Sequence, residues 1–210
     1  MKKTFTLLFL LLVICSTNNL IAKEIKLPKV DLDKGKKLMA CFSLRKTSRQ
    51  FSTRPISAQV ISEILYAADG INRPDGRKTV PTARNTQGQS IYVATAKGVW
   101  LYIPKNHSMK PILNKDIRKE CGLQAFHAKA PMILIYVANL TKIGKDRAEQ
   151  LLYAGNHAGY SSQNVYLYAA SENMATVVCG LVNKPKLGKI LNLPENNEVI
   201  FTQVIGYPSK

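Results

Sequence analysis

The chain has 210 residues, of which 46% are hydrophobic, and it carries a formal net charge of +17. This length and apolar content indicate one compact domain with a hydrophobic core and leave no second domain. The basic excess favours anionic partners. However, no nucleic-acid-binding motif is recognisable, and the aromatic residues do not alternate with the basic clusters. We therefore predict no nucleic-acid partner and interpret most of the charge as a solvated basic surface.

Residues 1–22 have the pattern of a secretory signal. Two lysines follow the first methionine, an apolar run extends from Phe5 to Cys15, and Ala22 completes a cleavage site. The run is too short to cross a bilayer, so no stable membrane span is predicted. We predict an exported, periplasmic protein. Cleavage is favoured over lipid attachment at Cys15, because the bulky Ile14 precedes that cysteine.

A polar, extended leader over residues 23–35 precedes the folded part of the chain, residues 36–210. Two amphipathic helices are predicted first, one capped by Asp33 and one capped by Ser57 and ending at Gly70. Each has apolar residues at helical spacing on one face. These are Leu38, Met39, Phe42 and Leu44 in the first helix, and Val60, Ile61, Ile64 and Leu65 in the second.

Strands are predicted in three places after these helices. Residues 91–94 and 99–103 are joined by a short Lys-Gly connection, which is typical of a hairpin. Residues 131–137 form a continuous apolar run, as expected of a central strand. Residues 199–205 have the pattern of a last strand.

The longest helical pattern covers residues 146–172, and a short helix is predicted at residues 186–193. The long helix contains small residues that allow close approach of another backbone, in the core or across a dimer. These residues are Ala154, Gly155, Ala158 and Gly159. The order of elements predicts an α+β fold with an antiparallel-rich central sheet wrapped by helices.

Residues 45–51, with the sequence RKTSRQF, follow the first predicted helix. They place the cations Arg45, Lys46 and Arg49 around the hydroxyl of Thr47. A guanidinium with a hydroxyl two residues away suits a phosphate group. The alternative is a charged helix end that is stabilised by the helix dipole.

A second polar segment, residues 81–87 with the sequence PTARNTQ, leads into the predicted hairpin. The side-chain amides of Asn85 and Gln87 both donate and accept hydrogen bonds, as the polar edge of a flavin ring requires. The alternative is an ordinary polar turn. Taken together, the two segments are candidate walls of one site, the first for a phosphate and the second for a planar ring.

With two further motifs, residues 163–170 (QNVYLYAA) and 204–208 (VIGYP), the chain resembles the FMN-dependent nitroreductase family. It looks closest to the SagB-type branch of that family, and the resemblance covers residues 36–210. It implies a nitroreductase-like fold in an intertwined homodimer, with FMN bound at the dimer interface. It also implies ping-pong transfer of hydride or electrons between small molecules, with NAD(P)H as one candidate donor.

The resemblance further implies which residues hold FMN, whereas it assigns no catalytic residue on the substrate side. The first segment is implied for the phosphate and ribityl chain, the second for the polar edge of the ring, and a later backbone stretch for the reactive nitrogen. In this order, the residues are Arg45, Lys46, Thr47 and Arg49, then Thr82, Asn85 and Gln87, then Val178, Cys179 and Gly180. Lys210 is implied as a further residue of the phosphate site.

Three cysteines and three histidines lie in the predicted mature chain. Cys41, Cys121 and Cys179 are interpreted as isolated or buried thiols, although a bridge between the first two stays open. The histidines, which are His107, His127 and His157, lack the spacing of metal ligands, so no metal site is predicted. His157 is a candidate for lining the flavin pocket.

Two other functions stay open at this point. One is a SagB-like dehydrogenase that oxidises a peptide or small molecule, since NAD(P)H is scarce outside the cytoplasm. The other is an exported basic binding protein that keeps the fold without turnover. Neither the substrate nor the electron donor is determined by the sequence.

Overall fold

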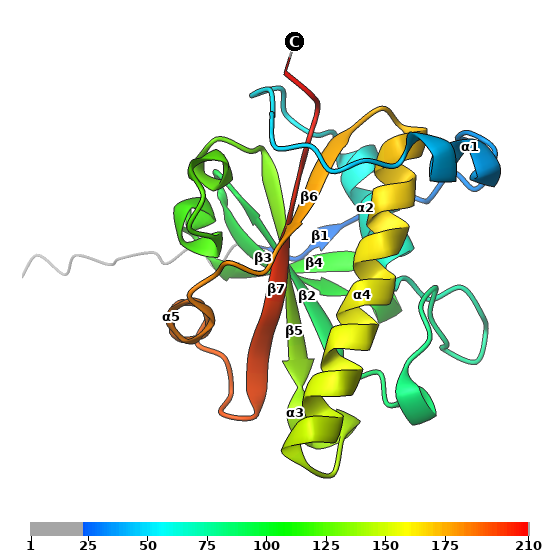
Figure 1. The fold of residues 1–210 in the computed structure, drawn as a ribbon. Helices are drawn as coiled ribbons and strands as arrows, with labels where there is room; N and C mark the ends of the chain where they lie inside the picture. Colours follow the sequence, from blue (N-terminus) through cyan, green and yellow to red (C-terminus); the bar gives the residue numbers. More distant parts are fainter. Residues whose placement is uncertain (1–22, 210) are drawn as a thin grey trace, which may run out of the picture.

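The central strand of the sheet confirms the strongest strand prediction. β5 (Met132–Asn139) is buried over almost its whole length, and it pairs with β2 on one side and β7 on the other. In the computed structural model, which describes residues 23–209, the seven strands have the order β1-β4-β3-β2-β5-β7-β6 and every pair is antiparallel (Figure 1). The predicted signal at residues 1–22 and Lys210 lie outside the described residues. The other strands are β1 (Ile25–Lys26), β2 (Gln89–Thr95), β3 (Gly98–Ile103), β4 (Ser108–Leu113), β6 (Ala175–Cys179) and β7 (Asn197–Gly206).

Five α-helices and four short 3-10 turns connect the described strands. The predicted long helix is confirmed as α4, and the predicted hairpin is formed by β2 and β3 with Thr95 opposite Gly98. None of the helices in residues 23–209 is both long enough and apolar enough to cross a membrane. The helices are α1 (Leu38–Leu44), α2 (Ala58–Asp69), α3 (Leu140–Ile143), α4 (Arg147–Ser171) and α5 (Lys184–Ile190). The turns are η1 (Ala83–Asn85), η2 (Pro104–Asn106), η3 (Arg118–Cys121) and η4 (Ala125–Ala128).

Helices α2 and α4 cover one face of the sheet (Figure 1). Alternate residues of β2 and β5 point to this face, because side chains along a strand alternate between the two sides. The buried cluster is formed by Ile64, Leu65 and Ala68 of α2, Ala158 and Val165 of α4, and Ile91, Val93, Met132, Leu134 and Tyr136 of the sheet. This packing fixes α4 above the strands that lead to the candidate site.

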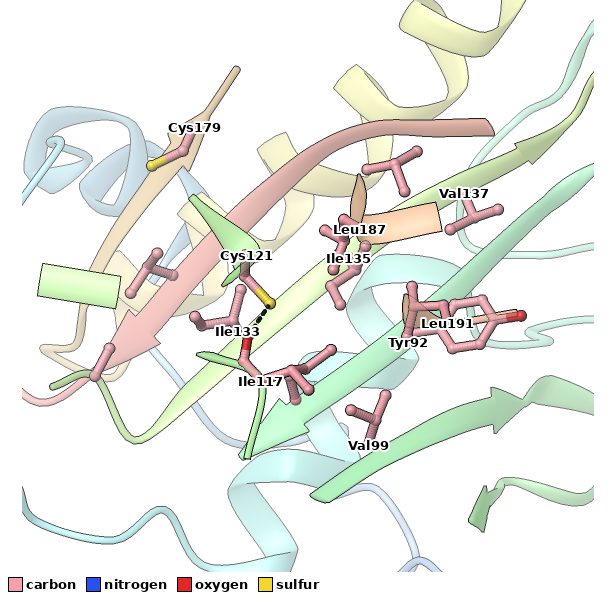
Figure 2. Close-up of a cluster of buried hydrophobic side chains, with 14 of the residues drawn as sticks. Tyr92, Val99, Ile117, Cys121, Ile133, Ile135, Val137, Cys179, Leu187 and Leu191 are labelled. Atoms are coloured by element: carbon pink, nitrogen blue, oxygen red, sulfur yellow. Dashed lines mark hydrogen bonds between the residues drawn. The ribbon is translucent and has the colours of Figure 1, made fainter. Parts of the chain in front are cut away.

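The opposite face is covered by α5 and by the turns between β4 and β5. Figure 2 shows Ile133, Ile135 and Val137 of β5 in this second cluster, together with Leu187 and Leu191. Because β5 contributes to both clusters, its run of apolar residues has no polar interruption, as expected of a strand buried on both sides.

The first predicted helix forms, but its start and its environment differ from the prediction. α1 begins at Leu38 after Lys37, which makes no side-chain capping bond, so the expectation of a cap at Asp33 is wrong. Gly35, which lies between Asp33 and Leu38, has a left-handed φ of +103°, so no helix continues from Asp33 to Leu38. The four residues of its expected apolar face are all exposed in the protomer. Their exposed fractions are 59% for Leu38, 75% for Met39, 50% for Phe42 and 48% for Leu44.

The three cysteines are free and buried, so the bridge between Cys41 and Cys121 is not formed. Burial raises the pKa of Cys121 to about 12 and that of Cys179 to about 11. Both thiols therefore stay protonated at neutral pH, as expected of buried, unreactive cysteines.

The predicted leader is docked on the domain. Lys34 donates to the buried carboxylate of Glu63 on α2 at 2.7 Å, and the same carboxylate accepts from Tyr168 of α4 at 2.6 Å and from Gln59 at 2.8 Å. Burial alone would raise the pKa of Glu63, but the hydrogen bonds from Lys34, Tyr168 and Gln59 outweigh it and lower the pKa. Glu63 thus ties together the leader, α2 and α4.

We expect Glu63→Gln to lower the free energy of unfolding by about 1–3 kcal/mol, because a neutral amide leaves a buried donor unpaired. Since the pKa of Glu63 is lowered on folding, its contribution is complete above the pKa of the unfolded carboxyl. It is then lost as the pH falls through the lower, folded value. Urea unfolding at neutral and acidic pH measures both effects. The matched control is Glu195→Gln at an exposed position, and equal losses in the two variants would contradict this role.

Candidate functional site

The segment that follows α1 lies along the free edge of the sheet. β6 is an edge strand, and its outward-facing Thr176 carbonyl accepts from the backbone N–H of Ser48 at 3.0 Å. On the C-terminal side, Ser209 N–H donates to the Gln50 carbonyl at 3.4 Å and Phe51 forms a bridge with Pro208. The predicted phosphate segment is thus held in an extended course between β6 and the end of the chain.

Tyr166 of α4 is the centre of contacts in this part of the site. Its hydroxyl accepts from the backbone N–H of Val178 at 3.0 Å and lies 3.2 Å from the hydroxyl of Thr47. The guanidinium of Arg45 lies over its ring, 5.3 Å from the centroid, a favourable cation–π distance. The structure therefore brings Arg45, Thr47 and Val178 together around Tyr166, a residue that the sequence did not single out. One signal was available, because Tyr166 lies within the motif at residues 163–170 that carries part of the family resemblance.

The buried side-chain amide of Gln203 fixes the position of Tyr166 relative to the sheet. Gln203 of β7 donates to the Ser162 carbonyl of α4 at 3.2 Å and to the Thr176 hydroxyl of β6 at 3.1 Å, and it accepts from Tyr136 at 2.6 Å. Ser162 is one helical turn before Tyr166. The amide therefore joins α4 to the strands at the point where Tyr166 reaches the β6 edge.

Arg49 lines a hollow of about 330 Å³ beside this segment. Lys129 and Ser209 line the same hollow, and Phe126 forms an apolar wall. Two cations and a hydroxyl at one concave place suit a phosphate group. Lys129 was missed by the sequence analysis because it lies 80 positions after Arg49. Lys46 is exposed, and Lys210, the residue after Ser209, lies outside the described residues.

The backbone after β6 is open. Cys179 is buried and its raised pKa keeps the thiol protonated at neutral pH, so its sulfur is not poised as a nucleophile. Gly180 is exposed, and a Cβ placed there would meet no atom within 4 Å. A planar ligand can therefore approach this backbone closely.

The second predicted segment forms a tight loop around η1. Arg84, Asn85 and Gln87 all have a left-handed backbone, with φ values of +52°, +54° and +47°. The Thr82 hydroxyl accepts from Gln87 N–H at 3.1 Å, and the Gln87 amide donates to Asn85 Oδ1 at 3.2 Å. Non-glycine residues with positive φ are uncommon and concentrate at functional sites. The amides predicted to meet a ring edge thus lie on a loop whose unfavourable backbone conformation is held by hydrogen bonds.

The two predicted walls meet α4 at different levels. The first segment contacts Tyr166, whereas Ala83 donates to His157 and Arg84 pairs with Glu149 at 2.9 Å. His157 and Tyr166 are nine residues apart, which corresponds to about 13 Å along the helix and about half a turn around it. Within one protomer, the segments are therefore separate clusters along one helix rather than adjoining walls.

The donors present fit a phosphate-bearing flavin. Arg45, Arg49 and Lys129 supply positive charge, Thr47 and Tyr166 supply hydroxyls, and the loop of Asn85 supplies amides that both donate and accept. These are the groups that a phosphate and the carbonyl-and-imide edge of a ring require.

We expect Tyr166→Phe to lower the free energy of unfolding by about 1 kcal/mol, because the Val178 N–H and the Thr47 hydroxyl lose their partner. The amide hydrogen of Val178 should exchange faster with solvent. Urea unfolding and hydrogen exchange measure these effects. Tyr66→Phe, on α2, should change neither, because the Tyr66 hydroxyl has no hydrogen-bond partner among the described residues, and unchanged exchange at Val178 in Tyr166→Phe would contradict the assignment.

The comparisons with known proteins identify the family of this chain. A family model described as the Nitroreductase family matches residues 43–207. A nitroreductase-family protein of Methanocaldococcus jannaschii is 34% identical over 185 residues, covering 82% of this chain and 91% of that protein.

Solved structures show the same fold. A nitroreductase-family protein of Ralstonia eutropha superposes with a TM-score of 0.85 at 33% identity, covering 89% of this chain and 90% of that one. The NADPH:FMN oxidoreductase of Vibrio harveyi, solved with NAD⁺, has a TM-score of 0.63 at 20% identity and covers 82% of this chain and 69% of its own. The match along most of the sequence, together with relatives that share a third of their residues, shows that this chain belongs to the nitroreductase family of oxidoreductases.

Proposed function

We propose that this protein is an FMN-dependent oxidoreductase whose flavin lies at the interface of a homodimer. The observation that carries the proposal is the cluster at the β6 edge, where Arg45, Thr47 and Tyr166 meet the backbone of Val178. A helix end that was merely solvated would need no such cluster. The family membership supports flavin as the ligand that this cluster serves.

Each group has a distinct task in this proposal. Arg45, Thr47 and Arg49, with Lys129 opposite, hold the phosphate and ribityl chain, and Asn85 and Gln87 meet the polar edge of the ring. When bound, FMN supplies reversible hydride transfer, which allows a donor and an acceptor to react in turn in a ping-pong cycle.

The backbone that follows Val178, at Cys179 and Gly180, contributes to this chemistry through its amide groups, whereas the Val178 N–H already donates to Tyr166. Donors held by a strand need no reorganisation when negative charge develops nearby, so they stabilise that charge whatever their side chains are. Because the Cys179 thiol is buried and protonated, its sulfur is assigned no part in the reaction.

The exposed apolar surface of the helices supports the dimer. The outer side of α4 carries Leu151, Leu152 and Tyr160, each about half exposed, and α1 packs against the same helix. Gly155 and Gly159 lie among these residues, and a Cβ at either would meet no atom of the protomer within 4 Å. Large exposed apolar surfaces mark interaction sites, and small residues allow a second helix to approach. A dimer through this surface would also bring additional walls to a site whose two segments are separate in one protomer.

The electron donor and the location are part of the proposal. NAD⁺ in the Vibrio harveyi structure supports NAD(P)H as a candidate donor. The pattern of residues 1–22 supports export, and export would favour a different donor or a dehydrogenation that reduces the flavin. Bleaching of the flavin spectrum by NAD(P)H distinguishes these cases.

The purified protein should be yellow, or become so with added FMN, and Arg45→Ala with Arg49→Ala should weaken FMN binding by at least tenfold. The reason is that each guanidinium makes charge-assisted contacts worth about 1.5–3 kcal/mol. Absorbance and fluorescence titration measure the affinity. Lys97→Ala together with Lys105→Ala removes equal charge elsewhere and is the control. A folded wild-type protein that takes up no FMN would refute the proposal.

A second prediction concerns the dimer. Gly155→Leu should shift the protein to monomers, because a large side chain prevents close approach of a second helix. The protomer should not be destabilised, since Leu has a higher helix propensity than Gly by about 0.8 kcal/mol. Sedimentation measures the assembly state. Lys186→Leu, an equally bulky side chain on the exposed part of α5, should leave it unchanged. A Gly155→Leu protein that dimerises as tightly as the wild type would place the interface elsewhere.

A further inference from the structure

The loop around η1 is held in a costly conformation. Its three left-handed residues, Arg84, Asn85 and Gln87, are not glycines. A residue in a sparsely populated backbone region costs about 1 kcal/mol or more and persists only where its surroundings determine it. The groups that hold the loop therefore decide whether its amides are presented at all.

The outer anchors of the loop are exposed. Arg84 pairs with Glu149 at 2.9 Å, and its guanidinium lies 5.5 Å from the centre of the Tyr153 ring. The side chain of Arg84 is about half exposed. Exposed pairs of this kind contribute about 1 kcal/mol or less, so they do not offset the strain of three residues.

The inner anchor is a buried histidine. His157 of α4 is 2% exposed, and its Nε2 accepts from the backbone N–H of Ala83 at 2.9 Å. Tyr153 stacks on the imidazole, with an angle of 9° between the rings. The ring is thus fixed in orientation and faces the first residue of η1.

The hydrogen bond determines where the imidazole carries its proton. Because Nε2 accepts, a neutral His157 carries its hydrogen on Nδ1. Nδ1 is buried and has no hydrogen-bond partner among the described residues. A second proton could only be placed on Nε2, where it would oppose the N–H of Ala83 and break the contact.

The charged groups that face this region come in pairs. On the loop side, Arg84 is neutralised by Glu149. On the α2 side, Asp69 is paired with Lys78 at 2.6 Å, and Gln89 connects this region to α4 through Ser161 at 2.6 Å. Burial raises the pKa of Asp69 to about 6, and below that value the remaining charge of Lys78 opposes an imidazolium. None of these groups therefore favours protonation of His157, and burial lowers its pKa.

We propose that His157 is a positioning residue whose neutral imidazole holds Ala83, so that Asn85 and Gln87 present their amides to the flavin ring, and whose protonation releases the loop. The inference rests on the flavin site proposed above. It assigns to one buried side chain the control of ring binding by pH.

The experiment compares FMN affinity between pH 5 and pH 8 in the wild type, His157→Gln and His157→Leu, with His107→Gln as a matched control. The carbonyl of Gln can accept from Ala83 N–H but does not titrate, whereas Leu cannot accept. The phosphate of FMN itself titrates near pH 6. The informative quantity is therefore the ratio of wild-type to His157→Gln affinity, since both share the phosphate site.

We expect the ratio to be near 1 at pH 8. As His157 takes up its proton at low pH, the ratio should fall by up to tenfold per pH unit, as one linked proton requires. His157→Leu should bind FMN at least tenfold more weakly at pH 8. His107→Gln should follow the wild type, because His107 bonds to Ser62 and Tyr102 and not to the loop. A ratio that is independent of pH, or wild-type affinity in His157→Leu, would overturn the proposal.

A measurement without flavin separates this inference from the proposed function. The amide hydrogen of Ala83 should be protected from exchange at pH 8 in the wild type and in His157→Gln. After correction for intrinsic rates, only the wild type should lose protection at pH 5. If the wild type binds no FMN at any pH, the proposed function fails, and this amide still decides whether His157 holds the loop. Equal protection of the Ala83 amide in the wild type and in His157→Gln at pH 5 would show that protonation of His157 does not release the loop.

Discussion

The side-chain amide of Gln203 is the interaction on which the geometry of the site depends. It is fully buried, and its donors and acceptor are all used by groups from β5, β6 and α4. A buried polar network that is fully satisfied specifies one arrangement, because any shift leaves a polar group without a partner at a cost of about 1–3 kcal/mol. Apolar packing alone would hold α4 over the sheet, but it would tolerate sliding. The amide fixes the level at which Tyr166 meets the edge of β6.

From this fixed point, α4 acts as the common support for the two parts of the site. Near its C-terminal end, Tyr166 supports the phosphate segment, and nearer its start, His157 supports the loop of amides. The phosphate segment has no regular structure, and the loop of amides has only the short η1 turn. In the proposed site, the distance within one protomer between the phosphate segment and the loop of amides is set by helix geometry rather than by loops.

Local patterns predicted most of the fold, whereas contacts between distant residues escaped prediction. The apolar run of β5 and the turn before Gly98 are properties of short stretches, so the central strand and the hairpin followed directly from the sequence. β4 was missed because Lys110 and Pro111 interrupt its pattern. In the candidate site, the sequence singled out Arg45 and Thr47 as motif residues, but it did not show the contacts of Lys129 and Tyr166, because these arise only from the tertiary fold. The same limit explains α1, whose apolar spacing identified a helix face without showing that the face is left uncovered in the protomer.

The course of residues 45–50 along β6 has a consequence for solubility. A free strand edge offers unpaired backbone groups to any other strand, and edges of this kind promote association between sheets. Here the Ser48 amide occupies the Thr176 carbonyl and the Tyr166 hydroxyl occupies the Val178 amide. The segment that we propose for the flavin phosphate is therefore also the cover of the sheet edge. A substitution that displaces this segment would expose unpaired backbone groups of β6 that can pair with another strand. Loss of the proposed FMN binding and a tendency to aggregate should therefore arise together from a single local change.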